Sequence, residues 1–215
     1  MRSNDGAIDS NGDFWVGTMA NFDEEVTPVG KLYKYNSKTL KEEVIIKDVA
    51  ISNGINWFGD YMYWTSSLEH RIYRFKYDYK SGSIDPSTKE VFIDIPKIFH
   101  DRPQYQKGEP DGSTMDQEGN LYVSVWGTNR VIKVNSKGEL VHEYILPANQ
   151  ISCVTIGGPN FDQLFVTSGD KNLMVDDSSK WKSDPNDLGG NIFKIQLESG
   201  IKGIAKNKWS GELQV

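Results

Sequence analysis

The stretch from Gly108 to Gly127, GEPDGSTMDQEGNLYVSVWG, decides the predicted fold because turn residues in it lead directly into a strand. Asp111 stands between a proline, which fixes one backbone dihedral, and a glycine, which accepts a left-handed one. We therefore expect a sharp turn that presents the Asp111 carboxylate. A second turn is expected at 116–119, and residues 120–126 alternate two sets of side chains with the period of two that is typical of a strand.

This order of turn, turn and strand recurs along the chain. It is seen in Arg2-Ser3-Asn4-Asp5-Gly6, followed by Asp9 to Gly12 and a strand at 14–19, and further units begin near 52 and 152. Four units spaced by about 40 to 60 residues, each of several short strands, are the pattern of propeller blades. A β-sandwich is the alternative all-β fold, but the recurring order favours a β-propeller. The expected strands are 14–19, 30–35, 43–46, 61–65, 71–77, 91–93, 120–126, 130–134, 140–145, 163–167 and 191–197.

Composition limits the classes of partner. The chain has 215 residues and a net charge of −6, which argues against nucleic acid or an anionic membrane as the main partner. It contains no apolar run near the ~20 residues that a membrane helix needs. The single cysteine, Cys153, rules out an internal disulfide framework and is expected to be a small buried residue. We therefore predict a cytoplasmic protein.

Three of the predicted turns carry an oxygen donor beside a glycine. These donors are Asn4 and Asp5 before Gly6, Asn53 before Gly54, and Asp111 before Gly112. If the units are equivalent, the donors meet near one axis, where carboxylate and carboxamide oxygens suit a hard divalent cation such as Ca²⁺. The alternative is that each residue only shapes its own backbone, because Asn-Gly and Asp-Gly are common turn dipeptides.

Several segments together resemble one family, that of regucalcin (senescence marker protein), gluconolactonase and luciferin-regenerating enzyme. They are RSNDGAIDSNGDFWVGTM (2–19), SNGINWFGDYMYWTSSLEHRIYRFKYDYKSG (52–82), PDGSTMDQEGNLYVSVWG (110–127), GGPNFDQLFVTS (157–168) and GGNIFKI (189–195). The resemblance implies a six-bladed β-propeller that binds one divalent ion and hydrolyses sugar lactones. On this basis residues 1–215 are expected to form a single β-propeller domain with about four blades, incomplete at the N-terminus, where the family's Glu ligand would lie.

The resemblance also implies roles for individual residues. Asn53 and Asp111 are the expected metal ligands, and Arg2 and Asn4 are expected to hold substrate oxygens. Glu24 is assigned the second substrate contact only because it is an acidic residue in the right region. The expected ion is Ca²⁺, with Zn²⁺, Mg²⁺ or Mn²⁺ as alternatives. Because cation binding weakens Asp111 as a base, we expect a metal-bound water as nucleophile and Asp111 as the group that orients it.

Other functions compete with a lactone hydrolase that takes a small-molecule lactone as its substrate. One is a non-catalytic propeller that binds calcium or a metabolite. Another is an interaction scaffold that uses the loops at 96–110 and 170–190, for which Asn53 and Asp111 would be dispensable. A third is an inactive fragment, since the isolated 215 residues are expected to express poorly and to be inactive unless an upstream segment supplies the Glu ligand. Arg2 could also be simply a solvated terminal residue.

Overall fold

The structure is a computed structural model that describes residues 1–21, 27–170 and 184–212. The chain divides into two compact units, Met1–Asp94 with Ala205–Val215, and Ile95–Ile204, and each is described by itself. Nearly all regular structure is β-strand, as the strand and turn pattern predicts. The assignment of residues 1–215 to a single domain stays a prediction.

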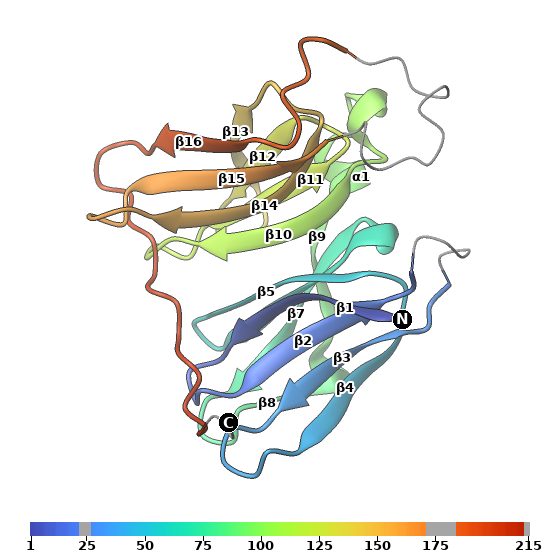
Figure 1. Cartoon of the computed structure of the whole chain (residues 1–215), viewed down its shortest axis with the longest axis vertical. Coiled ribbons are helices and arrows are strands. Elements are labelled where there is room, and N and C mark those ends of the chain that lie inside the picture. The colour runs from blue at the N-terminus through green and yellow to red at the C-terminus, as the bar shows by residue number, and fades with distance from the viewer. Residues whose placement is uncertain (22–26, 171–183, 213–215) are drawn as a thin grey trace. The chain divides into compact units, whose positions relative to one another are not determined.

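The first unit contains two antiparallel sheets within its described residues (Figure 1). The first sheet has the order β1-β2-β3-β4, with β1 (Arg2–Ile8), β2 (Phe14–Met19), β3 (Gly30–Tyr35) and β4 (Glu42–Val49). The second has the order β5-β6-β7-β8, with β9 also paired to β7. Its elements are β5 (Ser52–Phe58), β6 (Tyr61–Ser66), the 3-10 turn η1 (Ser67–Glu69), β7 (Arg71–Asp78), β8 (Ser83–Ile84), the 3-10 turn η2 (Pro86–Thr88) and β9 (Glu90–Asp94).

The second unit also contains two antiparallel sheets in its described part. It opens with the short helix α1 (Ile95–Ile98) and the 3-10 turn η3 (Pro103–Tyr105), so the predicted loop at 96–110 contains helical turns. One sheet has β10 (Glu109–Met115), β11 (Leu121–Trp126), β12 (Arg130–Val134) and β13 (Leu140–Ile145) in that order. The other has β14 (Gln150–Gly157), β15 (Gln163–Gly169) and β16 (Ile192–Gln196).

Each unit buries its own hydrophobic core between its two sheets. The core of the first unit is rich in aromatic side chains. It consists of Trp15, Leu32, Val49, Ile55, Met62, Trp64, Tyr73, Phe75 and Tyr77. The core of the second unit is mainly aliphatic. It consists of Tyr122, Val131, Leu146, Ala148, Ile151, Val154, Ile156, Leu164, Val166 and Leu197. Burial of such side chains contributes roughly 1.5–3 kcal/mol each, so these two cores hold the paired sheets together.

The turns predicted at the oxygen donors are wrong, because these residues lie inside strands. Asn4 and Asp5 are in β1, Asn53 is in β5 and Asp111 is in β10. In each strand the pairing register shifts at the donor, which is the mark of a β-bulge. β14, which is the first strand of its sheet as β1, β5 and β10 are of theirs, also has a shift, between Ile151 and Cys153. A bulge kinks a strand and re-aims side chains without ending the strand.

Two other predicted turns are confirmed, and one aspartate organises each of them. Asp9 Oδ1 accepts the backbone N–H groups of Asn11 and Asp13, both at 2.9 Å, and Oδ2 accepts Trp15 Nε1–H at 2.8 Å. The Tyr77 hydroxyl from the neighbouring sheet also donates to Asp9 Oδ2 at 2.9 Å. One fully buried carboxylate therefore joins the β1–β2 turn to the core of the first unit.

Asp116 repeats this arrangement in the β10–β11 turn. Its Oδ1 accepts the N–H groups of Glu118 and Asn120, and its Oδ2 accepts the hydroxyl hydrogen of Tyr122 at 3.2 Å. The partners stand two, four and six positions after the aspartate, as they do after Asp9. The repeat predicted from the sequence is thus present in the hydrogen bonds of two sheets.

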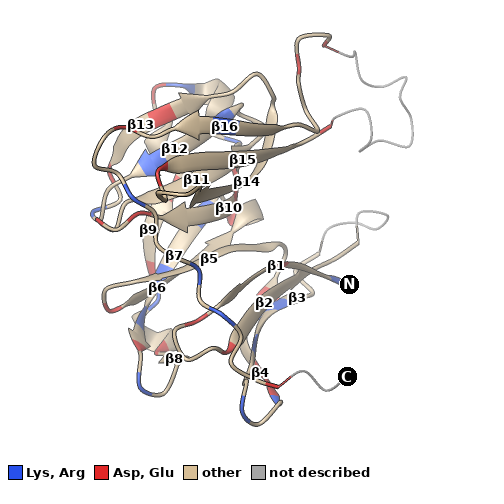
Figure 2. Ribbon diagram, turned by 60° about the vertical axis from the view of Figure 1, so that its left-hand side comes forward, with Lys and Arg blue, Asp and Glu red and all other residues tan. Residues whose placement is uncertain are grey.

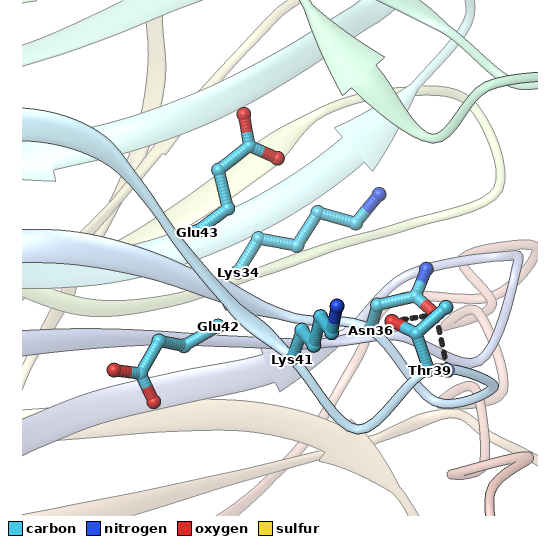
Figure 3. A pocket seen from close by; sticks show the side chains of 6 residues that line it. All are labelled: Lys34, Asn36, Thr39, Lys41, Glu42 and Glu43. Carbon is cyan, nitrogen blue, oxygen red and sulfur yellow. Dashed lines mark hydrogen bonds between the residues drawn. The ribbon is translucent and has the colours of Figure 1, made fainter.

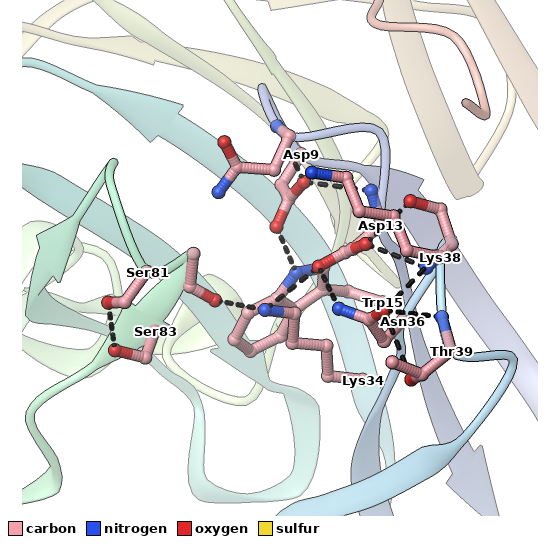
Figure 4. A network of polar contacts seen from close by, with 12 residues as sticks. Asp9, Asp13, Trp15, Lys34, Asn36, Lys38, Thr39, Ser81 and Ser83 are labelled. Carbon is pink, nitrogen blue, oxygen red and sulfur yellow. Dashed lines mark hydrogen bonds and ion pairs between the residues drawn. The ribbon is translucent and has the colours of Figure 1, made fainter. Parts of the chain in front are cut away.

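A buried ion pair lies beside the Asp9 turn (Figure 4). Lys34 Nζ is 3.0 Å from Asp13 Oδ2, and it also donates to the carbonyl oxygen of Gly82. Asp13 Oδ1 accepts from the backbone N–H and the hydroxyl of Ser37 at 2.8 and 2.9 Å. Burial alone would raise the pKa of Asp13, but the bonds from Ser37 and Lys34 outweigh burial and lower this pKa below its usual value.

Residues near the end of the described chain pack on this same turn. Asn207 Nδ2 donates to the Ile8 carbonyl at 3.0 Å, and the Ser210 hydroxyl donates to the Asn11 carbonyl at 3.1 Å. The Trp209 ring stacks on Tyr35 with ring centres 5.9 Å apart. This segment therefore belongs to the first unit although it follows β16 in sequence.

The Asp9 network predicts a large loss of stability in Asp9→Ala. The substitution leaves buried N–H and O–H donors without their acceptor, so we expect a loss of about 3 kcal/mol in the free energy of unfolding. Guanidinium unfolding followed by tryptophan fluorescence measures it. The control is Asp60→Ala, at an exposed position in the β5–β6 turn, and a loss below about 1 kcal/mol in Asp9→Ala would contradict this account.

The lowered pKa of Asp13 predicts an acid-dependent stability. A carboxyl group whose folded pKa lies below its unfolded value of about 3.9 stabilises the fold above that value, and the contribution is lost as pH falls through the folded pKa. The difference in unfolding free energy between wild type and Asp13→Asn should be constant from pH 7 to about pH 5 and shrink towards pH 3. Asp13→Asn combined with Lys34→Met controls for the unpaired lysine, and a pH-independent difference would refute the prediction.

Candidate active site

Asn4 and Asn53 lie together in the first unit, as the repeat predicts. Asn4 Nδ2 donates to Asn53 Oδ1 at 2.9 Å and to the carbonyl oxygen of Ser52, also at 2.9 Å. Asn4 is exposed on β1, whereas Asn53 is buried on β5. The bulges in these two adjacent strands therefore bring an exposed amide and a buried amide into contact.

The opposite edge of the Asn53 amide contacts a residue that the sequence analysis did not identify. Asn53 Nδ2 donates to the Ser67 hydroxyl oxygen at 2.8 Å, and Ser67 is itself buried. Ser67 follows β6, and its backbone N–H donates to the carbonyl oxygen of Ile51 just before β5. No local pattern in the sequence marks Ser67, since the contact depends on the pairing of β5 with β6.

Asp5 has a mainly local role in the same bulge. Its Oδ1 accepts the N–H of the next residue, Gly6, at 2.7 Å. Burial raises the pKa of Asp5, while the Gly6 N–H and the charge of Lys206 act in the opposite direction. This hydrogen bond fits the alternative that a donor beside glycine shapes its own backbone.

Asp111 lies in the β10 bulge of the second unit, partly exposed. Gly112 after it packs against β14, where a Cβ atom on Gly112 would come within 2.5 Å of Cys153 Sγ and 2.9 Å of Cys153 Cα. Cys153 is exposed, so the prediction of a buried cysteine is wrong. It stands at the bulge of β14, where the backbone shift turns its side chain away from the core.

The segment leading to Asp111 is fixed by an ion cluster. Glu143 on β13 binds Arg102 with both oxygens, at 2.7 and 2.9 Å, and also accepts from Arg130 at 2.8 Å. Gly108 at the end of this segment packs so closely on Thr128 that a Cβ atom there would lie 2.5 Å from its methyl group. The segment before β10 is therefore fixed at Arg102 by the ion cluster and at Gly108 by packing on Thr128.

Of the two other predicted site residues, Arg2 and Glu24, the structure describes Arg2 alone. Arg2 is exposed at the start of β1, with Nη2 3.8 Å from the sulfur of Met19. Glu24 lies outside the described residues. Within residues 1–21, 27–170 and 184–212, no three His, Cys, Asp or Glu side chains group where they could hold a metal ion. The predicted ligands, one amide and one carboxylate, are not such a group, and they belong to different units.

A pocket of about 250 Å³ lies elsewhere in the first unit, at β3, β4 and the turn between them (Figure 3). It is lined by Lys34, Asn36, Thr39, Lys41, Glu42 and Glu43. Asn36 Oδ1 accepts the N–H and the hydroxyl hydrogen of Thr39, and Lys34 is bound to Asp13. These polar groups stabilise the turn and the ion pair, so this pocket is not our candidate site.

Among the residues that the structure describes, neither the distribution of charged residues nor the hydropathy of the helices indicates a class of binding partner for this chain. In the view of Figure 2, basic and acidic segments are dispersed over strands and turns. None of the helices in the described part of the chain combines the length and the apolar character needed to cross a membrane.

Comparison with known proteins finds a family model that matches most of the chain, and related proteins that match nearly all of it. The family model described as the SMP-30/Gluconolactonase/LRE-like region matches residues 1–170. The cell growth-regulated gene 1 protein of Candida albicans is 35% identical over 227 residues, covering 99% of this chain and 65% of that protein. Regucalcin of Xenopus laevis is 30% identical over 220 residues, covering 98% of this chain and 67% of that protein.

A solved structure supports the fold class. The regucalcin of Agrobacterium tumefaciens, described as a calcium-binding protein, has a TM-score of 0.79 at 29% identity, covering 96% of this chain and 64% of that chain. This likeness confirms the predicted all-β, β-propeller class. The chain spans about two-thirds of the length of these proteins.

The packing of Gly112 on Cys153 predicts the effect of Gly112→Ala. The new methyl group would overlap the backbone of β14, so the bulge that carries Asp111 must move, at a cost of about 1–3 kcal/mol in unfolding free energy. Thermal unfolding measures the cost. Gly157→Ala is the matched control, because its Cβ would meet the Phe165 ring at an ordinary 3.6 Å, and equal stability losses in the two variants would contradict the packing argument.

Proposed function

Since this chain belongs to the SMP-30/Gluconolactonase/LRE-like family, we propose that it acts as a metal-dependent hydrolase of sugar lactones. The observation that carries the proposal is the contact between Asn4 and Asn53. It joins an expected substrate-binding residue to an expected metal ligand through the oxygen of Asn53. The calcium-binding description of the Agrobacterium relative supports a divalent ion, with Ca²⁺ as first choice.

The donor chemistry of the chain fits such an ion. Asn53 and Asp111 are the proposed ligands, and both supply oxygen, which hard cations prefer to nitrogen or sulfur. Asn53 turns its oxygen towards Asn4 rather than into the protein interior, where its Nδ2 meets Ser67. When bound, a divalent ion would polarise the lactone carbonyl and lower the pKa of a water molecule beside it.

The residues of the chain would act on the ring ester. Water adds to the lactone carbonyl carbon and the ring C–O bond breaks, so the product is an open-chain hydroxy acid. In our proposal the Asp111 carboxylate accepts a hydrogen bond from the attacking water and orients it. Arg2 donates N–H groups to a substrate oxygen that becomes more negative during attack. Asn4, whose two N–H groups bind Ser52 and Asn53, accepts through Oδ1 from a hydroxyl group of the substrate.

The proposal is tested by hydrolysis of an aldonolactone in a pH-stat, corrected for spontaneous hydrolysis. Any turnover above the spontaneous rate, however low, should need added Ca²⁺ and stop in excess chelator. Asp111→Asn should lower kcat/KM at least about 100-fold, whereas Asp101→Asn, at an exposed position in the same unit, should not. The dependence on Asp111 and on the ion, rather than the absolute rate, is decisive.

The second candidate is a calcium-binding protein without catalysis, for which the description of the Agrobacterium relative is the supporting observation. Calcium binding that depends on Asn53, without hydrolysis of any lactone offered, would favour this candidate. Turnover that persists in chelator would reject the metal-dependent hydrolase instead.

A further inference from the structure

We infer that Ser67 is a positioning residue that orients the Asn53 amide so that its oxygen is available to a divalent cation. The inference rests on the proposed function, in which Asn53 is a metal ligand. It begins from the asymmetry of an amide group, in which one edge is an oxygen acceptor and the other an NH₂ donor. Only one of the two orientations of Asn53 presents an oxygen to a cation.

The orientation is determined by a chain of hydrogen bonds that begins at a backbone carbonyl. The carbonyl oxygen of Ser52 can only accept, so the Asn4 atom that faces it at 2.9 Å must be Nδ2. The same NH₂ group faces Asn53 at 2.9 Å, so the Asn53 atom there must be an acceptor, Oδ1. The other edge of Asn53 is therefore Nδ2, and it donates to Ser67 Oγ at 2.8 Å.

Ser67 is well placed to hold this edge because its own backbone is fixed. Its N–H donates to the carbonyl oxygen of Ile51, and its carbonyl accepts from the N–H of His70 at 2.9 Å. Ser67 is 2% exposed and Asn53 6% exposed, so water has little access to replace the hydroxyl. Without the hydroxyl, the buried Nδ2 would have to seek another partner, and rotation of the amide would move Oδ1.

Residues that orient a metal ligand typically change metal affinity 10- to 100-fold when they are lost. The experiment is isothermal titration of the chain with CaCl₂, with thermal unfolding recorded for each variant. We expect Ser67→Ala to raise the Kd for Ca²⁺ about tenfold. Ser67→Cys should also raise it, because a thiol fills nearly the same space but is a weak hydrogen-bond partner.

Ser66→Ala is the matched control. Ser66 is the adjacent serine, is also buried, and makes no side-chain cap hydrogen bond at η1. Its Kd should stay within about twofold of wild type, because the Ser67 hydroxyl is retained.

The Asn53→Asp background separates orientation from a general loss of structure. Both side-chain ends of residue 53 are then oxygens, so a rotated side chain still presents a ligand. Adding Ser67→Ala in this background should change the Kd less than about threefold. An equal loss in both backgrounds, or an unchanged Kd in Ser67→Ala and Ser67→Cys, would overturn the inference while leaving the proposed metal site intact. Absence of Ca²⁺ binding in the wild-type chain would overturn the proposed metal site, and this inference with it.

Discussion

The backbone bulge in the first strand of a sheet is the constraint on which the candidate site depends. In a regular strand successive side chains alternate between the two faces of the sheet. The bulges at Asn4, Asn53 and Asp111 insert a residue into the pairing and so free a polar side chain from this alternation. The glycine after Asp111 permits a close backbone approach, as the contact between Gly112 and Cys153 shows.

This constraint also explains which parts of the fold the sequence could predict. The strands that follow the first strand of a sheet, such as β2, β3, β12 and β13, match the expected ranges at 14–19, 30–35, 130–134 and 140–145. They alternate regularly and are bounded by turn residues. The first strands of the sheets, β1, β5, β10 and β14, match none of the expected strands, because the glycines and bulges that suit them to a site also interrupt the period of two.

The candidate site was predictable to the extent that it is local or repeated. The contact of Asn4 with Asn53 follows from equivalent positions in successive units, and the turns at Asp9 and Asp116 follow from their aspartate and glycine spacing. The role of Ser67 was not predictable, because it arises from strand register across 14 positions rather than from a motif. The exposure of Cys153 was not predictable either, since it depends on a bulge in β14 that composition does not indicate.

The hydrogen bonds from Asn207 and Ser210 to Ile8 and Asn11 each span 199 positions in the chain. During synthesis on the ribosome, the first sheet must therefore exist for some time without them, with the Tyr35 ring not yet covered by Trp209. Contacts of such high sequence separation form late and slow folding. The β1–β2 turn is consequently among the last parts of the first unit to reach its final packing, which lengthens the period in which chaperones or proteases can act on it.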